Sequence, residues 1–330
     1  EFNGLLYFVA DDGVNGEELW QSDGTTVGTV MVKDINPGQG NQYPYGFGIL
    51  SSFPRDLTVI DGVLYFSAED NTHGAELWRS DGTAAGTVMV KDIFSGTFTD
   101  SYGTYPNSSN PANLVNVGGT LFFTAYDDDH GWELWTSDGT ESGTRLVKDI
   151  FTGTFTDTDG TYPNSSTPSQ LTDVDGVLYF VADDGTHGLE LWKSDGTEAG
   201  TTMVEDIRAG TGDAFGERIE LIAMNGILYF AADNGIVGDE LWRSDGTTEG
   251  TYLLKDVKTG SEGNLSYFTG FTVVDDHLFF SADDGTHGRE LWKTDGTEQG
   301  TALVADIALG TSSSYPFYMT AVDGILYFSA

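Results

Sequence analysis

The sequence contains no cysteine, which excludes disulfide bonds, thiolate catalysis and cysteine-ligated zinc. Basic residues are also scarce, because 14 Lys and Arg stand against 52 Asp and Glu and give a formal net charge of −38. Such a surface repels phosphate backbones and anionic lipid headgroups, so we expect no binding to nucleic acid or to anionic membrane surfaces. No apolar run approaches the ~18 residues that a membrane-spanning helix needs, so no membrane span is expected.

The most prominent feature that is present is an internal repeat. The triplet Glu-Leu-Trp recurs at intervals of 50 to 58 residues, and Ser-Asp-Gly-Thr or Thr-Asp-Gly-Thr follows each copy closely. The six copies are Glu18–Trp20, Glu76–Trp78, Glu133–Trp135, Glu190–Trp192, Glu240–Trp242 and Glu290–Trp292. A period of this length is typical of repeat architectures in which one supersecondary unit is copied along the chain.

Each copy resolves into four short apolar runs. In the fourth copy these are "QLTDV" (170–174), "VLYFVAD" (177–183), "LELWKS" (189–194) and "TMVEDI" (202–207). Glycine-containing turns such as Asp175-Gly176 separate them, and such turns between β-branched and aromatic runs indicate β-hairpins. Four antiparallel strands repeated six times predict an all-β fold, a six-bladed β-propeller of four-stranded blades that forms one domain over residues 1–330.

The repeated residues also resemble a known family. The motif is similar to the ELWxxDGT repeat of large bacterial proteins, and the similarity covers nearly the whole chain through its "ELW", "SDGT" and "GT" elements. This resemblance implies a propeller-like repeat array and implies no particular reaction.

The two ends of the chain carry the same strand. The sequence begins with "NGLLYFVADDG" (3–13) and ends with "DGILYFSA" (323–330), and only the C-terminal copy is preceded by a first strand, "YMTAV" (318–322). We expect the N- and C-terminal strands to close one composite blade. The surplus strand leaves two alternatives open, namely seven or more blades or a fragment of a longer repeat array that pairs with other copies.

Residues present in all six copies are interpreted as structural. The six tryptophans are predicted to fill the gaps between blades, and the repeated Asp and Glu to accept backbone N–H groups at turns. A repeated cation site is the alternative for these acids. The tryptophans are Trp20, Trp78, Trp135, Trp192, Trp242 and Trp292.

The "DDGTHG" turn varies more between copies. Its histidine is present as His73, His130, His187 and His287 and is replaced in the other two copies. A histidine beside a carboxylate could bind a metal or act as a general base. The alternative, in which the histidine caps its own hairpin through the neighbouring acid, is favoured because equivalent turns do not converge.

The loops that join successive repeats break the symmetry and are the candidate ligand-binding face, together with the "DDGTHG" turns. Two near-identical insertions span residues 94–114 and 151–171, and a different long loop spans 36–57. Tyr, Asn, Ser and Gly in these loops supply flat aromatic faces and adaptable hydrogen bonds. The candidate ligand-binding residues are Tyr43, Tyr45, Tyr105, Asn107, Tyr162 and Asn164.

One of these insertions contains a candidate calcium site. Asp157 and Asp159 stand in "DTDG", which looks like the start of a calcium loop. The complete twelve-residue pattern is absent, because the twelfth position falls at Pro168 rather than at a glutamate. Calcium is therefore the candidate cofactor, with Asp157 and Asp159 as its ligands.

No catalytic constellation is visible. The first strand of each repeat, where propeller enzymes usually place their chemistry, carries only Asp173 and Asn116 as strongly polar residues. A glycosidase needs two placed carboxylates. We therefore expect a non-catalytic, extracellular or cell-surface bacterial module for binding or adhesion, whose partner is a glycan, a protein or other copies of itself. The alternatives are a carbohydrate-active propeller enzyme with its carboxylates on the loops, and a structural repeat of a filament or surface layer.

Overall fold

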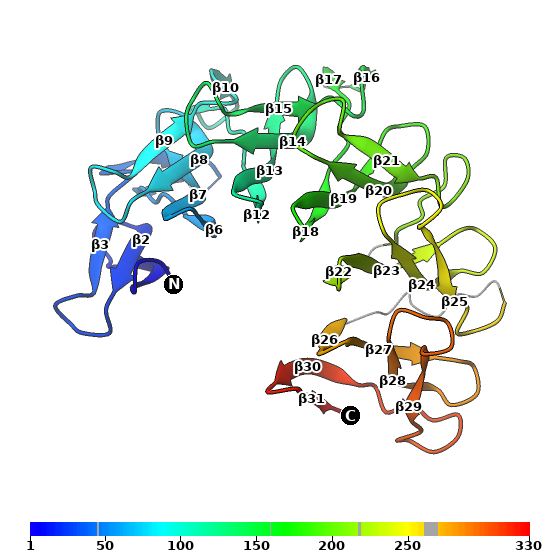
Figure 1. Ribbon diagram of the computed structural model, residues 1–330. Coiled ribbons are helices and arrows are strands. Elements are labelled where there is room, and N and C mark those ends of the chain that lie inside the picture. Colours follow the sequence, from blue (N-terminus) through cyan, green and yellow to red (C-terminus); the bar gives the residue numbers. More distant parts are fainter. Residues whose placement is uncertain (45, 159, 217–218, 261–269) are drawn as a thin grey trace. The chain divides into compact units, whose positions relative to one another are not determined.

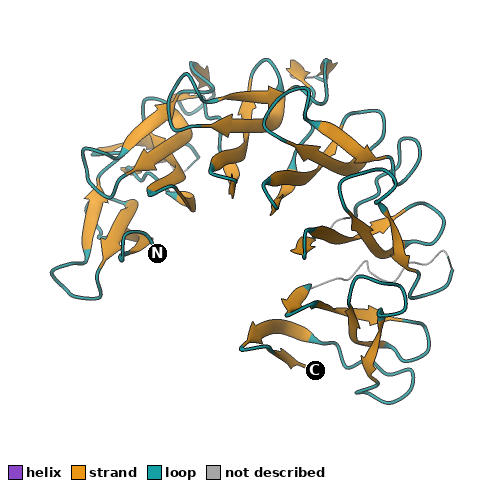
Figure 2. Ribbon diagram, viewed as in Figure 1, coloured by secondary structure: helices purple, strands orange, loops and turns teal. Residues whose placement is uncertain are grey.

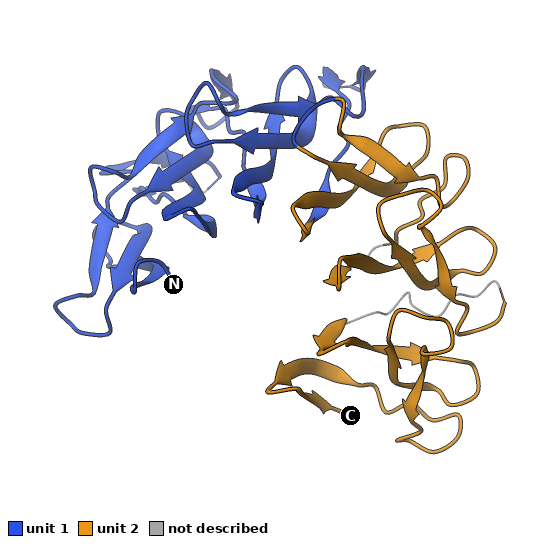
Figure 3. Cartoon of the chain, viewed as in Figure 1, with its two compact units in different colours: residues 1–171, 196–198 blue, residues 172–195, 199–330 orange. Residues whose placement is uncertain are grey.

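The computed structural model describes residues 1–44, 46–158, 160–216, 219–260 and 270–330. This part of the chain is all-β and contains no helix (Figure 2). It therefore holds no helix long and apolar enough to cross a membrane. The chain divides into two compact units (Figure 3), of which the first comprises residues 1–171 with 196–198 and the second comprises 172–195 with 199–330.

The first unit contains three repeat sheets, each followed by a hairpin (Figure 1). The repeat sheets are β1 (Leu6–Asp11), β2 (Glu17–Ser22) and β3 (Val30–Lys33); β6 (Arg55–Ile60), β7 (Val63–Asp70), β8 (Gly74–Ser80) and β9 (Val88–Lys91); and β12 (Ala112–Val117), β13 (Thr120–Asp127), β14 (Gly131–Ser137) and β15 (Arg145–Lys148). The hairpins are β4 (Gln39–Gln42) with β5 (Gly46–Ile49), β10 (Thr97–Thr99) with β11 (Thr104–Pro106), and β16 (Thr154–Thr156) with β17 (Thr161–Pro163).

The second unit takes up the chain within β18 and contains three further repeat sheets and a terminal hairpin. The sheets are β18 (Ser169–Val174), β19 (Val177–Asp183), β20 (Leu189–Ser194) and β21 (Thr202–Glu205); β22 (Leu221–Met224), β23 (Ile227–Asp233), β24 (Asp239–Ser244) and β25 (Tyr252–Lys255); and β26 (Thr272–Val274), β27 (His277–Asp283), β28 (Arg289–Thr294) and β29 (Ala302–Ala305). The hairpin is β30 (Phe317–Val322) with β31 (Ile325–Ser329).

The expected repeat of antiparallel strands is confirmed. Within the described residues, five sheets have four strands in sequential order, and the N-terminal sheet has three. In β19 and β20, Phe180 lies opposite Trp192 in an unbroken antiparallel register. The turn before β19 has φ of 52° at Asp175 and 84° at Gly176, as a type I′ turn requires. The number of blades and their closure by the terminal strands stay predictions.

Four of the repeated tryptophans lie in hydrophobic cores that join consecutive sheets, namely Trp78, Trp135, Trp242 and Trp292. Trp78 of the second sheet packs in one cluster with Leu19 and Val32 of the first, and the Lys33 ammonium lies 5.7 Å from the centre of the Trp78 ring. The same Lys33 Nζ donates a hydrogen bond to the Thr87 carbonyl oxygen at 2.7 Å. Trp20 is half-buried, and the other five tryptophans are 5–7% exposed. Lys91 makes the same bridge to Thr144 and Trp135 of the third sheet, so aromatic packing and a lysine link the successive sheets of the first unit.

The glutamate of each Glu-Leu-Trp is fully buried and holds the following loop. Glu76 accepts hydrogen bonds from the backbone N of Ile93 at 2.9 Å, the backbone N of Ser109 at 3.0 Å and the Ser109 hydroxyl at 2.5 Å. Burial raises the pKa of Glu76 to about 7, while these donors lower it. The sequence therefore places an acid inside the protein in order to satisfy loop N–H groups that would otherwise be unpaired.

Candidate functional site

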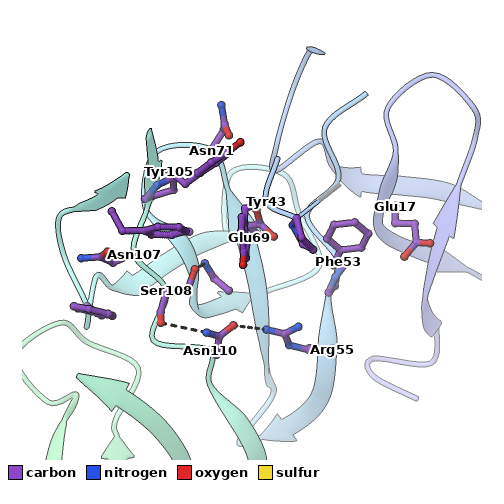
Figure 4. A pocket seen from close by; sticks show the side chains of 17 residues that line it. Glu17, Tyr43, Phe53, Arg55, Glu69, Asn71, Tyr105, Asn107, Ser108 and Asn110 are labelled. Atoms are coloured by element: carbon purple, nitrogen blue, oxygen red, sulfur yellow. Dashed lines mark hydrogen bonds between the residues drawn. The ribbon is translucent and has the colours of Figure 1, made fainter. Parts of the chain in front are cut away.

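A cavity of about 640 Å³ lies in the first unit, between the loops that follow the first and second repeat sheets. Its wall is formed by Tyr43 of the β4–β5 hairpin, the segment 53–55, the turn between β7 and β8, and the β10–β11 hairpin with residues 106–110 (Figure 4). These segments are loops between repeats and a "DDGTHG"-type turn. Both kinds of segment belong to the ligand-binding face that the sequence predicts. The volume lies within the range of roughly 300–1,000 Å³ that small-molecule sites occupy.

One wall of the cavity is aromatic. Phe98 and Tyr105 stand opposite each other in the β10–β11 register, with ring centres 5.7 Å apart. Tyr43 packs edge-on against both rings, at 5.4 Å from Phe98 and 5.6 Å from Tyr105. Tyr105 is only 5% exposed, whereas Tyr43 and Phe98 are 51% and 39% exposed. The buried ring therefore anchors two rings that remain available to a ligand.

The opposite wall is held by backbone contacts around Gly74 and Ala75. Ala75 N donates to the Ser108 hydroxyl at 3.0 Å, and Asn110 N donates to the Ala75 carbonyl oxygen at 3.0 Å. Gly74 has φ of +72°, and a Cβ atom there would lie 2.0 Å from the carbonyl oxygen of Asn107. Only glycine permits this approach, so the 106–110 segment is fixed against the β7–β8 turn.

The polar groups of the cavity come from side chains that these contacts position. Arg55 donates to Asn110 Oδ1 at 3.1 Å, and Asn110 in turn donates to the carbonyl oxygen of Ser108 at 3.2 Å (Figure 4). Glu17 is exposed and Glu69 is half-buried. Burial raises the pKa of Glu69, and the Gln42 amide and the Arg55 guanidinium partly oppose this shift. The Phe53 ring lies between Glu17 and Glu69 in the view of Figure 4.

The third repeat carries the twin loop but has larger side chains at two positions that line the cavity in the second repeat. The position of Ala75 is occupied by Trp132 and that of Glu69 by Tyr126, and these two rings pack edge-on at 5.9 Å. Phe94 adds a third ring 5.3 Å from Tyr126. Trp132 lines a separate cavity of about 260 Å³ with residues of β12, β13 and the segment 167–168. Large side chains therefore fill in the third repeat the space that Ala75 leaves open in the second.

The structure brings three of the six sequence-predicted ligand residues to the cavity, namely Tyr43, Tyr105 and Asn107. Asn107 also has a structural contact, because its side-chain N donates to the Ser95 carbonyl oxygen at 3.0 Å and closes the hairpin. Asn164 makes the equivalent bond to Thr152 in the twin loop. Tyr162 packs 5.7 Å from Phe155, away from the cavity. Tyr45 lies outside the described residues.

Sequence reasoning missed several residues that line the cavity. They are Glu17, Phe53, Arg55, Glu69, Ala75 and Phe98. A signal was present for Ala75, since an alanine stands where the next repeat has tryptophan beside an almost identical loop. The meaning of that difference depends on the contact between the β7–β8 turn and the loop that follows β9, which the repeat pattern does not reveal.

The predicted calcium site is only partly within the described residues. Asp157 accepts a hydrogen bond from Gly160 N at 3.1 Å in the turn between β16 and β17, whereas Asp159 lies outside them. Among the residues that the structure describes, no group of three or more His, Cys, Asp or Glu is placed to hold a metal ion. Calcium binding at this loop stays a prediction.

The histidines of the "DDGTHG" turns each bond to the acid three residues earlier. Nδ1 lies 2.8–2.9 Å from Oδ2 of that aspartate in all four copies. In the second repeat, the hydrogen bond to Asp70 raises the pKa of His73. This contact lies within one turn, so the geometry is that of a hairpin cap.

Comparison with known proteins gives no family for this chain. No protein-family model matches it, and no curated protein matches it. Solved structures match at low similarity. A prolyl endopeptidase shares 14% identity at a TM-score of 0.48, with 99% of this chain and 45% of that chain covered. BamB from Moraxella catarrhalis shares 12% identity at a TM-score of 0.42, with 98% of this chain and 76% of BamB covered. The β-propeller domain of the trilobed protease from Pyrococcus furiosus shares 11% identity at a TM-score of 0.39, with 92% of this chain and 79% of that domain's chain covered.

The chain thus spans less than half the length of the prolyl endopeptidase that it matches. Identities of 11–14% and TM-scores below 0.5 give no basis for transferring an activity from any of these three proteins.

Proposed function

We propose that the chain is a non-catalytic binding module of the cell surface or extracellular space that takes a glycan in the cavity of its first unit. The observation that carries this proposal is the presence in one cavity of the aromatic wall of Tyr43, Phe98 and Tyr105 and of the polar side chains of Asn107, Ser108 and Asn110. Aromatic rings stack on the apolar faces of sugars, and amides and hydroxyls bond to the sugar hydroxyls. A few placed polar groups in an otherwise apolar pocket are typical of small-ligand sites.

A binding role is favoured over catalysis because only one of the two carboxylates of the cavity is shielded from solvent. Glycoside hydrolysis uses two carboxyl groups that flank one bond. Here Glu69 is half-buried, whereas Glu17 is exposed to solvent. A glycan is favoured over a protein ligand because the cavity has the volume of a small-molecule site. We propose in addition that the repeats are blades of a six-bladed propeller.

The test uses the twin loops as matched sites. The whole chain is screened on a glycan array, and the best glycan is then titrated into Phe98→Ala and Phe155→Ala. These residues occupy equivalent positions of the two hairpins, but only Phe98 lines the cavity. The proposal expects Phe98→Ala to weaken binding at least tenfold and Phe155→Ala to change it less than twofold. Equal effects of the two variants, or no glycan bound at all, would overturn it.

A further inference from the structure

We propose that the glycan taken by this cavity carries a protonated amino group and that Glu69 binds that group. The inference rests on the proposed function and adds the chemical class of the ligand. Its basis is that Glu69 is a half-buried acid in the cavity wall that lacks two contacts of its equivalents. It does not close its turn, as the acid does in four other repeats. It also has no ion pair of the kind formed by its equivalent in the fifth repeat, although the Arg55 guanidinium is close enough to lower its pKa.

The first contact that Glu69 lacks is the hydrogen bond that closes its turn. Four repeats have an aspartate at this position, and each accepts a hydrogen bond at 2.7 Å from the N–H of the glycine two residues later. In the second repeat the residue two positions later is Asn71, and its N–H donates instead to Asn36 Oδ1 at 3.0 Å. The turn is therefore satisfied without Glu69, whose side chain is one methylene longer than aspartate and lines the cavity.

The missing partner is a cation from the preceding repeat. In the fifth repeat the acid at this position, Asp233, forms an ion pair with Arg208 at 2.7 Å. Arg208 directly follows the Asp-Ile pair of the preceding repeat, and the residue at that place before Glu69 is the uncharged Asn36. Among the residues that the structure describes, no Lys or Arg nitrogen lies within 4.0 Å of a Glu69 oxygen. Arg55 is directed to Asn110 instead.

A protonated amino group of a ligand is a suitable partner for the Glu69 carboxylate. It supplies three hydrogen-bond donors and a positive charge to a carboxylate that interacts with the Gln42 amide and, at longer range, with the Arg55 guanidinium, but forms no ion pair. Its attraction to Glu69 is strengthened because the carboxylate is half-buried beside aromatic side chains. The electron-rich faces of the exposed rings Tyr43 and Phe98 also attract cations. Glu17 adds a second negative charge among the cavity residues, so that the two acids outnumber the one base, Arg55. Anionic sugars are disfavoured by these two acids and by the net charge of −38.

The experiment titrates the whole chain with three β-1,4-linked trisaccharides of the same length: glucosamine, N-acetylglucosamine and glucose. It is run at a pH where the amine is protonated. The inference expects the glucosamine trisaccharide to bind at least tenfold more tightly than the other two. In Glu69→Gln, which keeps the size of the side chain, this preference should fall below about twofold while the affinity for the glucose trisaccharide is retained. The control Glu141→Gln removes one charge from an exposed turn of the third repeat and should keep the preference.

The outcomes separate this inference from the proposed function. Equal binding of the three trisaccharides, or a preference that survives Glu69→Gln, overturns the amino-sugar inference and leaves glycan binding standing. A lysine-containing peptide that competes more strongly than the glucosamine trisaccharide overturns the assignment of the amine to a sugar. If the glycan array shows no ligand at all, both proposals fail.

Discussion

Ala75 and Trp132 occupy the same position in two successive repeats, directly before the buried glutamate and beside two loops of nearly identical sequence. Where the residue is alanine, it lines a cavity of about 640 Å³ together with the following hairpin. Where it is tryptophan, the indole packs edge-on against Tyr126, with ring centres 5.9 Å apart. A repeat fold can thus place a binding site at one position by removing a side chain there, with the surrounding scaffold unchanged.

The first prediction concerns the glycine that fixes the cavity wall. Gly74→Ala should lower the free energy of unfolding by about 2–4 kcal/mol, because a Cβ would meet the Asn107 carbonyl oxygen in a backbone that already has positive φ. Gly13→Ala is the matched control, since its φ is +77° but no atom lies within 4 Å of the added Cβ. Gly13→Ala should lower the free energy of unfolding by only about 1 kcal/mol. Urea unfolding measures both, and equal costs would show that the close approach is not needed.

A second prediction concerns the hydroxyl that bonds to the buried glutamate. Ser109→Ala removes a donor that lies 2.5 Å from Glu76 Oε2, so the carboxylate loses one of its buried partners. We expect a loss of about 1–3 kcal/mol in the free energy of unfolding. Ser142→Ala, in an exposed turn of the next repeat, should change it by less than about 0.5 kcal/mol. Thermal or urea unfolding of the two variants decides the matter, and an unchanged stability in Ser109→Ala would contradict the role given to this bond.

The strands and turns of this fold could be read from the sequence, whereas the site could be read only in part. The alternation of apolar runs with glycine turns marks β18 to β21 closely, because hairpin chemistry is local. Tyr43 and Tyr105 were identified by composition alone. Glu69 and Ala75 were missed because their role depends on the loop against which they pack, and the Asn107 amide was given a ligand role although it also closes its own hairpin. Contacts between distant segments carry no local signal.

The third prediction is that stability falls as the pH rises. Burial raises the pKa from 4.5 to about 7 in five of the repeated glutamates, which are Glu18, Glu76, Glu133, Glu190 and Glu240. Between these two values the folded chain retains protons that the unfolded chain releases, so acidification favours the folded state. Each such shift corresponds to roughly 3 kcal/mol. We therefore expect the free energy of unfolding to be larger near pH 5 than near pH 8 by at least about 3 kcal/mol.

The pH prediction needs a control for net charge. The chain carries a formal charge of −38, and its self-repulsion also weakens on acidification. Urea unfolding at both pH values is therefore repeated in about 1 M salt, where the screening length is only ~3 Å. The buried glutamates are shielded from salt, so most of the difference should persist. A difference that vanishes in salt, or a chain that is more stable near pH 8, would contradict the effect assigned to these residues.

The most direct test of the proposed site is to fill it in the way that the third repeat does. Ala75→Trp places an indole in the cavity, and Leu189→Trp places one at the equivalent position of the fourth repeat as a control. Circular dichroism verifies that both variants are folded, and the best glycan from the array is titrated into each by calorimetry. The affinity for the glycan should fall at least tenfold in Ala75→Trp and should be unchanged in Leu189→Trp. A folded Ala75→Trp that binds the glycan as tightly as the unaltered chain would show that the cavity is not the binding site.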